Sequence, residues 1–153
     1  MENSKSQILN PKQYQNPKQY DLEDRTFAFA QKVDRYANSL PKTISNIENA
    51  KQLVRAAGSV GANYIEANES LGKKDFLMRI RICRKEAKEG KYWLRLTEPK
   101  EEFAAEREAL IQEALEFTKI FGSILEKCKQ GFYLSFEFVW DLIRISQLRN
   151  RKF

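Results

Sequence analysis

The segment from Lys73 to Leu96 contains the most restrictive pattern in the sequence, because its apolar residues recur with the period of a helix. Advancing about 100° per residue places one apolar group, which includes Ile80, Cys83 and Leu94, on a single side that should face a core. One apolar stripe is enough for packing within a bundle. A second apolar group falls almost opposite and predicts an interface with another subunit: Met78, Ile82, Trp93 and Leu96.

The side of this helix between the two apolar groups is basic. We call its residues the basic arc: Lys74, Arg81, Arg84, Lys85, Lys88, Lys91 and Arg95. This concentration of positive charge, in a chain of net charge +6, predicts an anionic partner such as nucleic acid. The alternative is a solvated face whose charges pair with glutamates of the next segment, between Glu98 and Glu116. The sequence alone leaves both interpretations open.

The preceding segment, which we expect to be helical from between Thr43 and Asn49 through Glu69, has an unusual polar side. Its residues lie within an arc of about 80°, and we call them the polar row: Gln52, Arg55, Ser59, Asn63 and Glu66. Short hydrogen-bonding side chains at this spacing are more typical of a contact with another helix than of open surface. We therefore predict a structural polar seam within the bundle or between subunits, with a ligand site as the alternative.

Two further helical patterns, over residues 21–40 and about 101–129, complete the domain. Pro41, Gly72 and Pro99 separate the four segments. Four helices joined by short links predict an all-α fold, an antiparallel up-and-down four-helix bundle that covers residues 21–129.

The two ends of the chain differ from this domain in composition. Residues 1–20 contain the sequence Asn-Pro-Lys-Gln-Tyr twice, and we expect a flexible arm because each copy holds a helix-breaking proline. A basic and aromatic strap that stacks on nucleic acid is the alternative for this arm. Residues 130–153 form an apolar and basic tail whose periodicity fits a strand and a helix, so its conformation stays open.

Catalytic chemistry is poorly represented in the sequence. The chain has no histidine, which removes the usual general base and the commonest transition-metal ligand. We expect no enzyme activity, no metal site and no cofactor, since phosphate-binding glycine motifs are also absent from the sequence. Cys83 and Cys128 lie on predicted apolar faces, and no signal peptide or apolar run of about 20 residues occurs. These features predict a cytoplasmic protein with reduced cysteines that does not enter a membrane.

The polar row and the central helix also carry the motifs of a known family. Arg55, Ser59, Asn63 and Glu66 stand in an Arg-x-x-x-Ser-x-x-x-Asn-x-x-Glu pattern, and Lys-Glu-Ala and Tyr-Trp-Leu occupy residues 85–87 and 92–94. Over residues 21–129 the chain resembles small bacterial four-helix-bundle proteins first noticed as products of intervening sequences in 23S ribosomal RNA genes. The resemblance implies a bundle that assembles into a ring-like homopentamer without enzyme activity. A related branch, the accessory protein of diversity-generating retroelements, is a basic pentamer that binds nucleic acid and a reverse transcriptase.

Together these observations predict a non-enzymatic, oligomeric binding module. Its basic arc is expected to bind RNA or DNA with low sequence specificity, because regularly spaced Lys and Arg on a helix flank meet phosphates more readily than base edges. The alternative is a scaffold ring that holds a protein partner and binds no nucleic acid.

Overall fold

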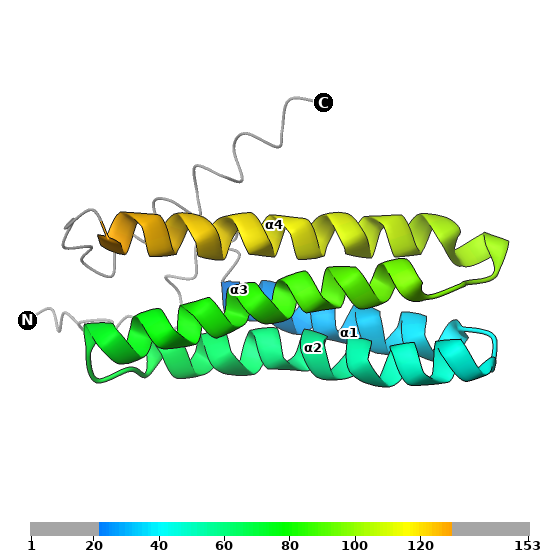
Figure 1. Ribbon diagram of the computed structural model, residues 1–153, viewed down its shortest axis with the longest axis horizontal. Coiled ribbons are helices and arrows are strands. Elements are labelled where there is room, and N and C mark those ends of the chain that lie inside the picture. Colours follow the sequence, from blue (N-terminus) through cyan, green and yellow to red (C-terminus); the bar gives the residue numbers. More distant parts are fainter. Residues whose placement is uncertain (1–21, 130–153) are drawn as a thin grey trace, which may run out of the picture.

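The computed structural model describes residues 22–129, in which four long helices lie side by side with nearly parallel axes (Figure 1). They are α1 (Leu22–Ser39), α2 (Ile44–Asn68), α3 (Lys73–Leu96) and α4 (Ala104–Lys129), and a short 3-10 helix, η2 (Glu101–Phe103), precedes α4. No strand occurs in this part of the chain. The predicted all-α, four-helix fold is therefore confirmed. The predictions of a flexible arm at residues 1–20 and of an apolar tail at 130–153 lie outside the described residues.

Helix α3 is the central element of the packing. It makes the most extensive contact in the bundle with α2 and the next most extensive with α4, whereas α1 packs mainly on α2 and only slightly on α4. In Figure 1, α3 accordingly runs between α2 and α4. None of the helices in residues 22–129 is long and apolar enough to cross a bilayer.

The core forms where the apolar sides of the four helices meet. The expected core side of α3 is buried, with Ile80, Cys83 and Leu94 fully covered. Aromatic rings from α1 and α4 lie in the same core, where Phe29 meets Phe117 edge to face with 5.4 Å between ring centroids. Such pairs add to the burial of apolar area, which is the main stabilising contribution to a bundle of this size.

Two links at one end of the bundle are joined by a buried side chain, that of Asn46. Its amide nitrogen donates to the carbonyl oxygen of Pro41 at 3.1 Å and to that of Glu98 at 2.9 Å. Its side-chain oxygen accepts from the backbone nitrogen of Glu98 at 2.9 Å. Asn46 thus ties the α1–α2 link to the α3–α4 link, while Thr43 caps α2 by accepting from the backbone nitrogen of Asn46.

Candidate nucleic-acid interface

The basic arc lies along the exposed side of α3 near α4. Core contacts fix the rotation of the helix, because burial of Ile80, Cys83, Ala87 and Leu94 turns the positions between 74 and 95 that carry the arc away from the core. Six members of the arc are exposed and Lys91 is half-buried. Helix α3 as a whole holds nine basic and three acidic residues, so it presents a strongly positive surface.

Arg84 reaches across to α4. A Cβ atom placed on Gly122 would lie 3.6 Å from Nε and 3.7 Å from Cζ of Arg84, which shows that the guanidinium rests against the α4 backbone at this glycine. A side chain larger than alanine at position 122 would have to displace it. The charge of Arg84 is thereby held at the junction of the two helices.

A shallow, open hollow of about 450 Å³ lies at this junction. Arg81, Arg84, Lys85 and Lys88 line it together with Glu89, and Leu125 supplies an apolar surface from α4. Lys85 approaches Glu89 at 3.5 Å and Glu86 at 3.9 Å, whereas the other three cations form no ion pair within residues 22–129. The hollow can therefore hold an anionic group against several positive charges.

Two glutamates of α4 are paired with cations outside the basic arc. Glu113 accepts two hydrogen bonds from Arg25 of α1, at 2.7 and 2.8 Å, and Glu116 pairs with Lys119 of its own helix at 3.0 Å. In the described part of the chain, no ion pair joins the basic arc to a glutamate between Glu98 and Glu116. The intramolecular pairing that the sequence left open is thus not found between these residues.

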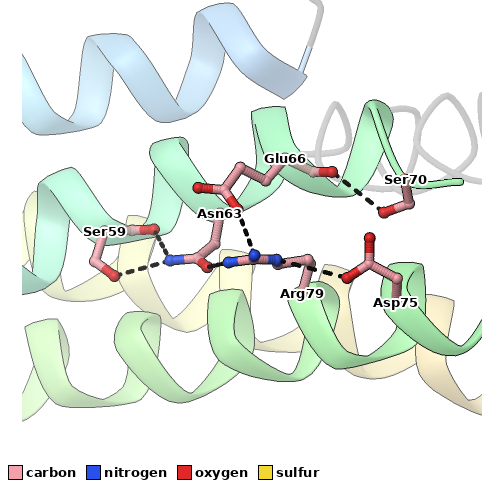
Figure 2. A network of polar contacts seen from close by, with 6 residues as sticks. All are labelled: Ser59, Asn63, Glu66, Ser70, Asp75 and Arg79. Carbon is pink, nitrogen blue, oxygen red and sulfur yellow. Dashed lines mark hydrogen bonds and ion pairs between the residues drawn. The ribbon is translucent and has the colours of Figure 1, made fainter.

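Two residues of the polar row, Asn63 and Glu66, contact Arg79 of α3 in the groove between α2 and α3, and a third, Ser59, is bonded to Asn63 (Figure 2). Asn63 donates to the carbonyl oxygen of Ser59 at 2.9 Å and to its hydroxyl at 3.1 Å, and accepts from Arg79 Nη1 at 3.2 Å. Arg79 Nη2 lies 2.6 Å from Glu66 Oε2, and its Nε lies 3.8 Å from Asp75. These contacts connect α2 and α3 within one protomer. The sequence interpretation missed Arg79, although its position outside the basic arc on the 100° plot was a usable signal.

The other two members of the row, Gln52 and Arg55, are exposed and form no hydrogen bond or ion pair within residues 22–129. The antiparallel pairing of Asn63 with Arg79 places Arg55 at about the level of Glu86 along the groove. The Glu86 side chain is only 17% exposed. Burial raises its pKa, the charge of Glu89 raises it further, and Lys85 lowers it. Arg55 is not among the charges that act on Glu86, so this carboxylate is only partly compensated, by Lys85.

The predicted interface residues of α3 fall into two pairs. Met78 and Leu96 are 46% and 42% exposed, whereas Ile82 and Trp93 are half-buried and Trp93 packs against the core. Helix α2 exposes further apolar side chains that the sequence interpretation did not single out: Ile44, Ile47, Val54 and Ile65. These share one side of α2, and the same angular plot would have found them.

The remaining candidates for chemistry are buried. Desolvation raises the pKa of the Cys83 thiol to about 12, and burial also raises that of Cys128. Within residues 22–129, no cluster of three His, Cys, Asp or Glu side chains is arranged to hold a metal ion.

Comparison with known proteins agrees with the fold. A crystal structure from Bacteroides thetaiotaomicron, described as a protein with unknown function from the S23 ribosomal protein family, superposes with a TM-score of 0.59 and is 26% identical in sequence. The alignment covers 69% of this chain and 98% of that one. No curated protein matches the chain. The sequence profile of the family described as 23S rRNA-intervening sequence protein matches residues 18–123, which is more than half of the sequence. The chain therefore belongs to that family.

Proposed function

We propose that this protein is a non-enzymatic, oligomeric module that binds RNA or DNA with low sequence specificity through the basic arc of α3. The observation that carries the proposal is the arrangement of Arg81, Arg84 and Lys88 around an open hollow, without an ion-pair partner in residues 22–129. Unneutralised cations in a row along a rigid helix are suited to phosphate groups, which release their counterions on contact.

Oligomerisation would strengthen such binding. The resemblance to the family implies a homopentamer, and the exposed Met78 and Leu96 supply apolar surface for a contact between copies. Several copies of the arc in one ring would engage one nucleic acid together, so modest contacts from each copy would combine by multivalency. Binding through phosphates also accounts for low sequence specificity, because phosphates carry no base information.

The alternative is a scaffold for a protein partner that binds no nucleic acid. Two observations favour it: the exposed apolar side chains of α2, and the exposed glutamates Glu98, Glu101 and Glu102, which could pair with the basic arc of a neighbouring copy. In this arrangement the charges of the basic arc would be paired across the contact between copies, and the apolar side of α2 would bind the protein partner.

Charge reversal separates the two proposals. The variant Arg81→Glu, Lys88→Glu, Arg95→Glu should lose binding to a nucleic acid of random sequence in a low-salt filter-binding assay. The matched control reverses three exposed cations of α1 and the α1–α2 link, Lys32→Glu, Arg35→Glu, Lys42→Glu, which changes the net charge equally. Equal binding by both variants and the parent, or no binding by the parent, would favour the scaffold. For the parent, affinity should fall steeply with salt.

A further inference from the structure

An exposed aromatic ring borders the basic arc. Tyr92 of α3 is 54% exposed, and its ring meets that of Trp93 edge to face with 5.0 Å between centroids. Trp93 packs against the core, so it supports the tyrosine ring from one side. An aromatic ring held in this way presents its face with little loss of side-chain entropy on binding.

Tyr92 lies among the cations that would bind phosphates. It is four residues after Lys88 and three before Arg95, and residues at these spacings are neighbours on a helix surface. Arg84, at the edge of the hollow, is eight residues away, or about 12 Å along the helix axis. The hollow itself combines cations with the apolar surface of Leu125. The arc therefore offers both phosphate contacts and apolar surface for bases.

We infer that the ligand of the basic arc is single-stranded nucleic acid, and that Tyr92 stacks on one of its bases. This inference rests on the function proposed above. Cations alone would be enough to bind a duplex through its phosphates. The bases of a duplex are stacked on each other, so they cannot contact a protein ring without being unstacked. Aromatic side chains placed among cations are the arrangement by which proteins hold single strands without reading sequence, because every base has a face for stacking.

The test compares single strands with duplexes of equal length. Fluorescence anisotropy is measured with a labelled 20-nucleotide strand and the 20-base-pair duplex, in DNA and RNA versions, using the parent, Tyr92→Ala and Tyr92→Phe. The parent should prefer the single strands. Tyr92→Ala should weaken single-strand binding roughly five- to 150-fold, the effect of losing one stacked base, and leave duplex binding unchanged. Tyr92→Phe should retain the parent affinity because the ring is kept.

Two controls keep the outcome interpretable. Phe27→Ala removes an aromatic ring that is 63% exposed on α1, outside the arc, and should change neither affinity. A 2-aminopurine base in the strand should be quenched by the parent and less by Tyr92→Ala at saturating protein, an effect that lost stability alone would not produce. Equal affinity of the parent for strand and duplex, or an unchanged strand affinity in Tyr92→Ala, would overturn the stacking inference while leaving the proposed function intact. Absence of any parent binding would overturn both.

Discussion

Arg79 of α3 and Glu66 of α2 form the shortest ion pair between two helices in residues 22–129, with 2.6 Å from Nη2 to Oε2. The same guanidinium donates to Asn63, so one side chain from α3 connects two turns of α2. This seam lies in the groove between the two helices that pack most extensively.

Removing the guanidinium should therefore weaken the protomer. Arg79→Ala leaves Glu66 and Asn63 without their partner on α3, and we expect the free energy of unfolding to fall by about 1–2 kcal/mol. The matched control is Arg55→Ala, an exposed residue of the same polar row, which should change the stability of the protomer by less than about 0.5 kcal/mol. Urea titration followed by circular dichroism measures both. A larger loss in Arg55→Ala, with a fall in mass, would place Arg55 between subunits.

Replacing Asn46 should lower the free energy of unfolding more than replacing any residue of the seam between α2 and α3. Asn46→Ala removes three hydrogen bonds and leaves the carbonyl oxygen and nitrogen of Glu98 to find new partners, which should cost about 2–4 kcal/mol. Asn46→Asp keeps the size but turns an acceptor toward two carbonyl oxygens, so it should be no better than alanine. Thermal melts of the two variants and of the exposed-site control Asn38→Ala check this, and a melt of Asn46→Asp close to the parent would contradict it.

The half-buried Glu86 gives stability a pH dependence of known sign. Because its pKa is raised above the ordinary 4.5 on folding, the folded state holds the proton more tightly than the unfolded state. Its contribution to the free energy of unfolding therefore falls as pH rises from 4.5 through the raised pKa. Glu86→Gln should be more stable than the parent at pH 7, and the difference should shrink below about pH 4. Urea midpoints at the two pH values test this, with exposed Glu101→Gln as the control; a Glu86→Gln midpoint below that of the parent at pH 7 would contradict it.

Measuring the mass of the oligomer can show whether the subunit contact is made by the predicted interface on α3 or by the apolar side of α2. Met78→Asp with Leu96→Asp should reduce the particle mass toward that of an 18.0 kDa monomer in light scattering, because each carboxylate would be buried without a partner. Ile44→Asp, at an 86% exposed position of α2, should leave the mass unchanged. The reverse result would assign the contact to α2, and a monomeric parent at micromolar concentration would exclude the oligomer.

Helical period was sufficient to predict the four helices and the core side of α3. Residues such as Ile80 and Leu94 must be buried together whatever the bundle's handedness, so a one-dimensional pattern determines them. The members of the basic arc could be grouped for the same reason. Only their angular position on one helix was needed.

Contacts between helices required information that the pattern does not contain. The pairing of Arg79 with Glu66 depends on the register of α3 against α2, and the burial of Asn46 depends on two links that meet at one end of the bundle. The placement of Arg84 over Gly122 likewise depends on how α3 and α4 align. A change of one turn in any of these registers would leave the sequence pattern intact and give different partners.

The central position of α3 has a consequence for the thermodynamics of binding. The arc is carried by the helix that contacts both α2 and α4 most extensively, rather than by a loop or a terminal helix. A ligand that binds there meets backbone that is already ordered, so the entropic cost on the protein side is limited to the ends of lysine and arginine side chains. The arc is thus preorganised, and under the proposed function the entropic cost of adopting a fixed conformation would fall mainly on the nucleic acid.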